Sequence, residues 1–309
     1  MQPVRKDSMG WMKDFPDIRD FTPFTDNIPE RSRKRGVKHT VKELLSEVGF
    51  HASKTAKKSP KSKTKVDLRK WCSPIEDQGN IGSCTAHATT ALLEYYERRA
   101  HGIYIDASRL FLYKASRNLL RWHGDRGAHL RAAIGALALF GVPPEEYWPY
   151  NVSKFDEEPS AFCYSFAQNF KAISYYRLDP PHVDPHVLLD NIKSHMSKGL
   201  PLVFGFTCYN SMEEASDTGA IPFPSKKDKV DGGHAVMAVG YDDGKKIRNS
   251  DEGSADTTGA ILIRNSWGPD WGGMGGYLWL PYEYILQGLA DDWWTLIKNE
   301  WIETGQFGE

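Results

Sequence analysis

The sequence predicts an α+β fold in which a helical half precedes a half built from strands. Between residues 84 and 140, apolar residues recur at three- and four-residue intervals, the spacing of one helix face. From about Tyr176 onward, the apolar runs are rich in β-branched and aromatic residues and are bounded by Gly, Pro and Asp, which is typical of strands. With 309 residues, of which 40% are hydrophobic, the chain can bury one large core or two smaller cores that share an interface. We therefore expect an α+β protein of two lobes, and we find no internal repeat.

Composition divides the chain into an N-terminal extension (1–65), a helical lobe (66–175) and a β-rich lobe (176–309). The extension contains an aromatic stretch at 11–24 with too many apolar anchors to remain in water, so we expect it to dock onto the body. Residues 31–65 carry 12 Lys or Arg against 2 Glu and have few apolar residues, as flexible linkers do. A basic linker joined to an acidic body favours association of the two, or an acidic partner.

The first long helix is expected to begin at Cys84, after the turn-forming residues of "DQGNIGS" (77–83). No Gly or Pro interrupts residues 84–99, and His101 with Gly102 supplies a stop signal. The apolar face of this helix consists of Ala88, Ala91, Leu92 and Tyr95. Cys84 therefore lies in the first turn, where free backbone N–H groups and the helix dipole favour an anion. This location lowers the pKa of a thiol and increases the fraction of reactive thiolate.

Two further helices and four strands are expected in chain order. The helices lie in "ASRLFLYKASRNLL" (107–120) and "LRAAIGALALFGVPP" (130–144). The strands lie in "LPLVFGF", "HAVMAVGYD", "AILIRNSW" and "GYLWL". The polar stretch "DDGKKIRNSDEGSADTTG" (242–259) between the second and third of these strands is expected to be a long hairpin loop.

A reactive Cys84 needs a base and a group that holds this base in place. His87 lies one helical turn further on, so its side chain points away from the exposed side of the thiol and a structural role is expected for it. His234 is better placed, because glycines before it allow close approach of the chain and because it opens a strand. Asn265 ends the next strand, a place where an Asn on its own is usually a turn former.

Taken together, three segments resemble the papain family of cysteine peptidases: "QGNIGSCTA" (78–86), "GGHAVMAVGYD" (232–242) and "NSWGPDWGGMGGY" (265–277). The chain order of Gln, Cys, His and Asn is that of the family, and His234 follows Cys84 by 150 residues. Less specific matches in "GDRGAHLRAAIGALALFGV" and "EEYWPY" extend the resemblance over roughly 66–280.

The resemblance implies a papain-like fold of two lobes, one helical and one β-barrel-like, with the active-site cleft between them. It implies that Cys84 is the nucleophile, that His234 forms a thiolate–imidazolium pair with it, and that Asn265 orients the imidazole ring. Trp267 would shield the bond between Asn265 and His234 from water, which strengthens it. The Gln78 amide and the backbone N–H of Cys84 would form the oxyanion hole.

The resemblance also implies the substrate-binding residues Gly127, Ala128, Leu130, Gly233, Ala235 and Trp267. Gly127 and Ala128 occupy positions where the family's backbone pairs with an extended peptide. Leu130 and Ala235 would line an apolar pocket for the side chain two residues before the cut, with Asp291 or Asp292 adding charge at its floor. The alternative is that these are ordinary helix-entry and strand residues.

The aromatic segment 11–24 is expected to lie across the cleft or against its rim. There it could block substrate until it is removed, for example by a cut in "RSRKRG" (31–36). The alternative is that it only covers the outside of one lobe.

Two positions depart from the family pattern: Ile81 stands where a disulfide-bonded cysteine is common, and Thr85 where Trp is common. None of the four cysteines shows CxxC spacing, so no metal, redox site or cofactor is expected; these cysteines are Cys72, Cys84, Cys163 and Cys208. The missing disulfides fit a prokaryotic or viral-type member. The chain starts without the apolar run of a secretory signal and has no membrane-spanning stretch, so a cytoplasmic protein is the default expectation, with another export route left open.

We therefore expect a cysteine-type endopeptidase that acts on peptide or protein substrates through a thioester acyl-enzyme. A peptide ligase that resolves the same acyl-enzyme with an amine remains an alternative, as does a non-catalytic peptide-binding relative. A nucleic-acid partner is disfavoured because the lysine-rich run lacks interleaved aromatic residues.

Overall fold

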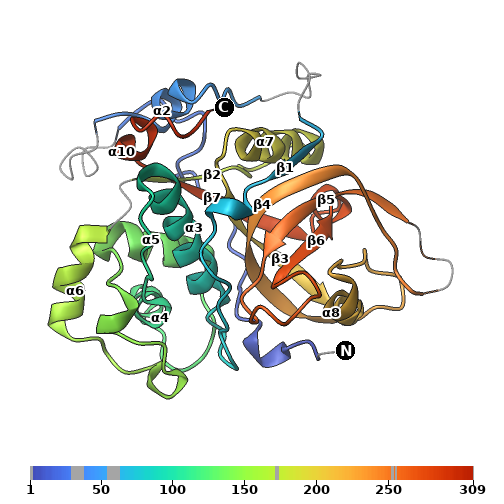
Figure 1. Cartoon of the computed structure of the whole chain (residues 1–309), viewed down its shortest axis with the longest axis horizontal. Helices are drawn as coiled ribbons and strands as arrows, with labels where there is room; N and C mark the ends of the chain where they lie inside the picture. The colour runs from blue at the N-terminus through green and yellow to red at the C-terminus, as the bar shows by residue number, and fades with distance from the viewer. Residues whose placement is uncertain are drawn as a thin grey trace.

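The computed structural model describes residues 3–28, 38–53, 63–170, 174–251, 254 and 256–308, and it places a helical region beside a sheet (Figure 1). The cleavage site suggested in "RSRKRG" and the most basic part of the linker lie outside the described residues. The division of the chain at residues 65 and 175 stays a prediction. Among the described residues, no helix is both long enough and apolar enough to cross a bilayer.

The helical region is built around α3 (Cys84–His101), against which α4 (Arg109–Leu120) and α5 (Leu130–Phe140) pack. The predicted start at Cys84 is confirmed, and the helix ends at Gly102, whose φ of 71° is the left-handed conformation that favours glycine. The remaining helices are short except for α7: α2 Val41–Glu47, α6 Ala161–Ala167, α7 Pro185–Ser197, α8 Ala215–Thr218, α9 Glu283–Leu286 and α10 Asn299–Ile302.

Seven strands of the described chain form one antiparallel sheet in the order β2-β7-β3-β4-β5-β6, with β1 paired to β4. Their bounds are β1 Lys65–Asp67, β2 Ser174–Arg177, β3 Leu202–Tyr209, β4 Val230–Ile247, β5 Thr257–Arg264, β6 Tyr277–Pro281 and β7 Ala290–Ile297. The four predicted strands therefore lie in β3, β4, β5 and β6.

The long loop expected at 242–259 is in part wrong, because β4 continues to Ile247 and β5 begins at Thr257. A register shift between Asp242 and Lys246 lets the strand pair continue past the bend. Most residues of this stretch are polar and partly or fully exposed, whereas Ile247 and Thr257, which pair with each other, are buried. A mostly polar stretch can therefore still pair as a strand.

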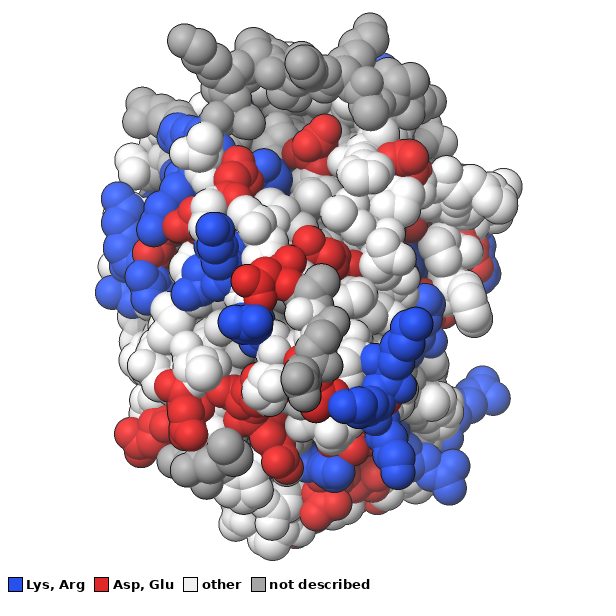
Figure 2. All heavy atoms as spheres, turned by 90° about the vertical axis from the view of Figure 1, so that its right-hand side faces the viewer, with Lys and Arg blue, Asp and Glu red and all other residues white. Residues whose placement is uncertain are grey.

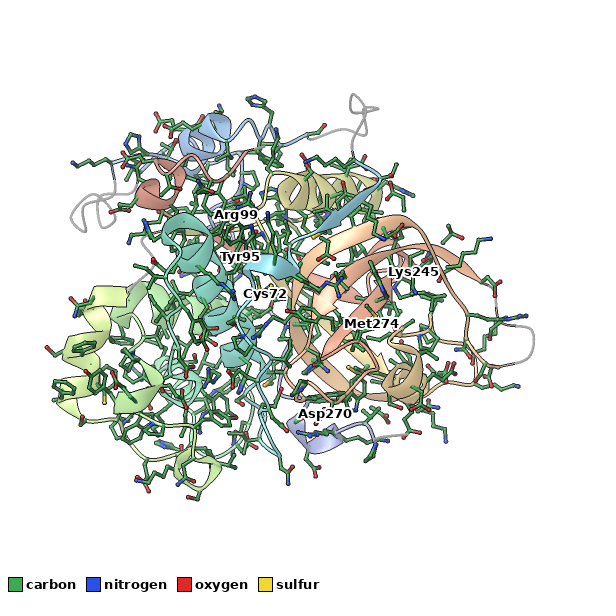
Figure 3. The ribbon with its side chains drawn as sticks, in the orientation of Figure 1. Cys72, Tyr95, Arg99, Lys245, Asp270 and Met274 are labelled. Atoms are coloured by element: carbon green, nitrogen blue, oxygen red, sulfur yellow. The ribbon has the colours of Figure 1, made fainter. Side chains whose placement is uncertain are left out.

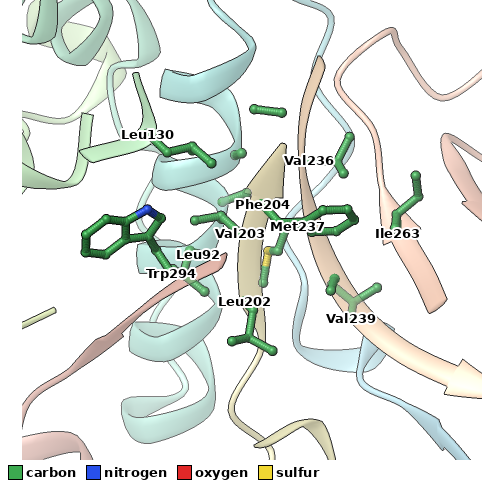
Figure 4. Close-up of a cluster of buried hydrophobic side chains, with 14 of the residues drawn as sticks. Leu92, Leu130, Leu202, Val203, Phe204, Val236, Met237, Val239, Ile263 and Trp294 are labelled. Carbon is green, nitrogen blue, oxygen red and sulfur yellow. The ribbon is translucent and has the colours of Figure 1, made fainter. Parts of the chain in front are cut away.

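Helical region and sheet share one hydrophobic core, which fixes their relative position. Figure 4 shows Leu92 of α3 and Leu130 of α5 facing Val203 of β3 and Met237 of β4, all of them buried. Burial of this apolar area is the main force that holds the two parts together.

The far end of α3 is held by polar contacts. Figure 3 places Tyr95 and Arg99 along this end of the helix, where the Tyr95 hydroxyl donates to the Gly199 carbonyl at 3.1 Å. Arg99 Nη1 donates to the Tyr95 hydroxyl at 2.8 Å. The helix that begins at Cys84 is therefore anchored at its other end to the turn that precedes β3.

Candidate active site

Cys84 is fully buried at the first position of α3, directly behind Ser83. Its sulfur is contacted by the backbone N–H groups of Ala235 and Gly10. Because Ala235 adjoins His234 in β4, the sheet brings the predicted histidine to the tip of the helix. Burial raises the pKa of the Cys84 thiol to about 11, and the backbone N–H contacts oppose this rise.

His234 is held in one tautomer by Asn265, the residue that follows β5. Its Nε2–H donates to Asn265 Oδ1 at 2.8 Å, and this oxygen also accepts the backbone N–H of Ser266 at 2.8 Å. An oxygen that can only accept requires the proton on Nε2, so Nδ1 carries the lone pair. Nδ1 is buried and has no hydrogen-bond partner among the described residues. Burial lowers the pKa of His234 to about 4, and the hydrogen bond to Asn265 opposes this by raising the pKa.

Trp267 covers this pair, as the family resemblance implied. Its ring centroid lies 4.7 Å from that of His234, and the side chain is 1% exposed. Trp271 meets Trp267 edge-on at 4.7 Å and keeps it in place. Water is thereby excluded from the bond between His234 and Asn265.

The Gln78 side chain is oriented by Ser266, a residue that the sequence reasoning missed. Ser266 Oγ donates to Gln78 Oε1 at 2.5 Å, so the amide N–H₂ group must face the other way. Gln78 Nε2 then donates to the carbonyls of Ile81 at 2.9 Å and Ser8 at 2.8 Å. The only available signal was the position of Ser266 directly after Asn265. The donor expected for the oxyanion is thus engaged by a carbonyl of the chain itself.

The N-terminal segment, residues 3–28, occupies the backbone positions implied for substrate. Ala128 N donates to the Gly10 carbonyl at 2.9 Å, Met12 N donates to the Ala128 carbonyl at 3.2 Å, and Trp11 N donates to the Gly233 carbonyl at 3.1 Å. The approach is so close that a Cβ on Gly127 would lie 1.9 Å from the Gly10 oxygen. In Figure 1 the segment, in dark blue, runs along the boundary between the helical region and the sheet.

The side chain of Trp11 fills a pocket between β3, β4 and β7. Its Nε1–H donates to Asp292 Oδ2 at 3.2 Å, whereas the neighbouring Asp291 forms an ion pair with Lys13 at 2.5 Å. Of the two aspartates suggested for the pocket floor, Asp292 therefore contacts the occupant. Ala235 pairs with Gly205 beside this pocket.

His87 has the structural surroundings expected for it. It is buried, its Nδ1 lies 3.1 Å from the Ser83 carbonyl, and burial lowers its pKa well below the usual value. Tyr150 was not anticipated from the sequence. Its hydroxyl donates to the Gln78 carbonyl at 2.8 Å and lies 2.7 Å from Ser83 Oγ, so it links the two ends of the loop before α3.

All four cysteines of the chain are free thiols. Within the described ranges, no group of three or more His, Cys, Asp or Glu side chains is arranged to hold a metal ion. Figure 2 shows both basic and acidic side chains on the face of the sheet region, in separate groups.

Comparisons with known proteins agree with this geometry. Residues 62–304 match the papain family cysteine protease profile. An uncharacterized peptidase C1-like protein of Acanthamoeba polyphaga mimivirus is 32% identical over 228 residues, which cover 71% of this chain and 68% of that protein. Chymopapain of Carica papaya is 25% identical over 209 residues, which cover 65% of this chain and 50% of chymopapain, so the match spans half of its length.

Solved structures share the fold. The crystal structure of Xylellain, a cysteine protease from Xylella fastidiosa, has a TM-score of 0.68 and 32% sequence identity, and the match covers 96% of this chain and 98% of that one. Digestive procathepsin L 3 of the Tenebrio molitor larval midgut, at 21% identity, shares the fold with a TM-score of 0.58 over 84% of this chain and 79% of that one. The α+β papain-like fold is confirmed, and the chain belongs to the papain family of cysteine proteases.

Proposed function

We propose that this chain is an endopeptidase that uses Cys84 and His234, and that its N-terminal segment blocks the cleft until it is displaced. The observation that carries the proposal is the tautomer of His234, which leaves the acceptor Nδ1 unpartnered among the described residues, on the strand whose next residue contacts the thiol. A base of this kind is what a cysteine nucleophile needs.

The reaction follows from these positions. His234 Nδ1 takes the proton of Cys84, and the thiolate attacks the peptide carbonyl to form a C–S bond. The resulting oxyanion accepts hydrogen bonds from Gln78 Nε2 and the backbone N–H of Cys84. The C–N bond then breaks as His234 gives its proton to the leaving amine, and water, deprotonated by His234, hydrolyses the thioester.

The direction of the N-terminal segment supports inhibition rather than cleavage. Along the segment, Ser8, whose carbonyl accepts from Gln78, precedes Trp11, whose side chain fills the pocket. In a substrate bound as the family resemblance implies, the pocket residue comes before the scissile carbonyl. The backbone of the segment therefore runs in the direction opposite to that of a substrate, and its Ser8 carbonyl takes the hydrogen bond of Gln78 that the oxyanion would accept.

The burial of the catalytic pair beneath the segment favours its neutral form, although the Gly10 N–H of the segment contacts the sulfur and lowers the thiol pKa in part. With the pKa of Cys84 at about 11 and that of His234 at about 4, both groups are uncharged at neutral pH. Displacing the segment admits water, which favours the charged forms of both groups and therefore the thiolate–imidazolium pair.

The test uses the full chain and measures hydrolysis of an unfolded protein substrate together with labelling by an epoxide inhibitor of the papain class. A Gly10→Ala variant displaces the segment, because the new Cβ would lie 2.0 Å from the Gly82 carbonyl oxygen. Gly135→Ala is the matched control, because its Cβ meets only the Tyr175 hydroxyl, at 3.8 Å. We expect Gly10→Ala to be labelled and active, the control to behave as wild type, and Cys84→Ala to be neither labelled nor active in either background.

Labelling that persists in Cys84→Ala would contradict the assignment of the nucleophile. Equal activity of wild type and Gly10→Ala would contradict inhibition by the segment. Formation of amide products when amines are added, without hydrolysis, would assign the chain to the peptide ligases instead.

A further inference from the structure

The pocket that holds Trp11 indicates which substrate side chain the protein prefers. We propose that this pocket selects tryptophan in a peptide substrate, rather than the aliphatic side chains that an apolar pocket would favour, with Asp292 and Gly205 as the residues that determine this preference. The inference rests on the proposed function, because it takes the cleft filled by the N-terminal segment to be the substrate cleft.

The backbone around the pocket leaves room for a large flat ring. Gly205 lies beneath the indole so closely that a Cβ there would be 1.9 Å from Trp11 Cε2. A Cβ on Gly233 would be 2.8 Å from Trp11 Cε3. Two positions on adjacent strands therefore lack side chains where the ring lies, so the indole packs directly against the backbone of both strands.

The polar end of the pocket demands an N–H donor. Asp292 is fully buried, and its Oδ1 is already engaged by Trp294 Nε1 at 2.7 Å and by Arg177 Nη1 at 3.1 Å. Its Oδ2 accepts from the Trp11 indole. A phenylalanine or leucine in the pocket would leave this oxygen buried without a donor, which a site built for a hydrogen bond penalises strongly.

Arginine is the side chain that competes most directly with tryptophan for this pocket. Arg177 is shared by two buried carboxylates, Asp179 at 2.9 Å and Asp292 at 3.1 Å, so these three groups together carry a net negative charge when ionised. When the segment leaves, Arg131 loses its partners Asp14 and Asp20, and Asp291 loses Lys13. Charge alone therefore does not exclude a cation, and the flat space beside Gly205 and Gly233 is what favours the indole ring.

The first experiment measures specificity in the full chain with the pocket vacated by Trp11→Ala. Fluorogenic dipeptide substrates that differ only in the residue facing the pocket (Trp, Phe, Leu or Arg) are compared by kcat/KM. We expect Trp to exceed Phe and Leu by at least about tenfold, because both leave the buried Asp292 oxygen without a donor, and to remain preferred over Arg. A preference for Leu, Phe or Arg would overturn the inference.

The same series is then measured with Asp292→Asn added. Asn tolerates the φ of 64° at this position, so the backbone is undisturbed. Its oxygen must face the donors of Trp294 and Arg177, which turns the N–H₂ group toward the indole N–H. We expect the ratio of Trp to Phe to fall to about unity, whereas Asp291→Asn, whose carboxylate pairs with Lys13 and does not accept from the indole, keeps the ratio. Gly205→Ala should shift the preference toward smaller side chains.

A second experiment does not depend on peptidase activity. Four full-length proteins are compared: wild type, Trp11→Phe, Asp292→Asn and the double variant. For each, the rate of Cys84 alkylation by iodoacetamide is measured by mass spectrometry. If the pocket reads the indole N–H, each single variant loosens the segment and accelerates alkylation, and the double variant is no faster than either single one. Additive effects would overturn the inference even if no substrate were cleaved, whereas a failure of cleavage with coupled alkylation would count against the proposed function alone.

Discussion

At His234, the bond to Asn265 decides which ring nitrogen carries the lone pair that the proposed mechanism needs. The side-chain oxygen of Asn265 receives two donors, from the imidazole and from the backbone of Ser266, and it cannot rotate to present its N–H₂ group without losing both. Ser266 in turn orients Gln78 through its hydroxyl. Asn265 and Ser266, two consecutive residues after β5, therefore fix the tautomer of the proposed base and orient the proposed oxyanion donor.

Gln78→Ala tests the oxyanion donor. Removing Nε2 deletes one hydrogen bond to the transition state, so we expect kcat in the segment-displaced Gly10→Ala background to fall by about 10²–10³. Ser266→Ala leaves the amide in place but frees it to turn, so its loss should be smaller, about tenfold or less. Alkylation of Cys84 should be unchanged in both variants, and a parallel loss of alkylation would show that the thiol itself had been disturbed.

The pH dependence of Cys84 alkylation tests whether Cys84 and His234 are both uncharged while the N-terminal segment is bound. In wild type the thiol, with its pKa raised to about 11 by burial, should react only as the pH rises well into the alkaline range, because only the thiolate is alkylated. In Gly10→Ala, water reaches the site and His234 can become protonated, and both changes favour the thiolate. The midpoint of the alkylation rate against pH should therefore move down to below about 7.5. Rates measured from acidic to alkaline pH give both midpoints. Coinciding profiles for the two proteins, with Gly135→Ala as control, would refute the link between the segment and the thiol pKa.

At the level of elements, the loop between Gln78 and Ser83 positions both proposed oxyanion donors, and Tyr150 holds its two ends. The phenol donates to the Gln78 carbonyl, which leaves its oxygen to accept from the Ser83 hydroxyl. Ser83 directly precedes α3, so the tyrosine couples the start of the nucleophile helix to the residue that carries the amide donor.

Tyr150→Phe removes both contacts while keeping the ring. We expect kcat to fall about three- to tenfold with little change in KM, because one net hydrogen bond is worth about 1 kcal/mol and the loop does not bind the rest of the peptide. Tyr241→Phe is the matched control: it removes a hydroxyl that donates to the Lys63 carbonyl at 2.6 Å, seven residues from His234 along β4. A similar loss of thermal stability in both, with kcat reduced only in Tyr150→Phe, supports positioning, whereas an equal fall in kcat for both would indicate general destabilisation.

The sequence predicted the elements whose signals are local. The start of α3 at Cys84 and its end at Gly102 follow from residues within one turn of each boundary, and the His and Asn that meet at the site were found because their motifs are specific. The extent of β4 was missed, since its outer part is mostly polar and its pairing with β5 crosses a register shift.

The contacts of the N-terminal segment could not be predicted to the residue. The segment was expected at the cleft from its aromatic content, yet the residues that enter the site are Ser8, Gly10 and Trp11, of which two are not aromatic. Their partners lie far along the chain, Asp292 at a distance of 281 residues from Trp11. No local pattern records such a pairing, because it depends on how the finished sheet places β7 next to β3.

Over the whole molecule, the N-terminal segment is tied to both regions by ion pairs between charged side chains on the cleft rim. On the helical side, Arg131 of α5 pairs with Asp14 and Asp20, each at 2.7 Å. On the sheet side, Lys6 pairs with Asp231 at 2.7 Å and Lys13 with Asp291 at 2.5 Å. Since the segment bridges the two regions, its release would free the cleft along its length and not at one subsite only.

These rim pairs are partly exposed, so salt should loosen the segment. The screening length falls from about 30 Å at about 10 mM salt to about 3 Å at about 1 M, which weakens every pair at once. We expect the alkylation rate of Cys84 in wild type to rise about three- to tenfold over this range of NaCl, because each exposed pair contributes little alone and the effect is their sum. In Gly10→Ala the segment is already displaced, so its rate should be insensitive to NaCl. A wild-type rate that stays flat would mean that the buried contacts of Trp11 and Ser8 hold the segment by themselves, and the same rise in Gly10→Ala would place the salt effect on the thiol instead of the segment.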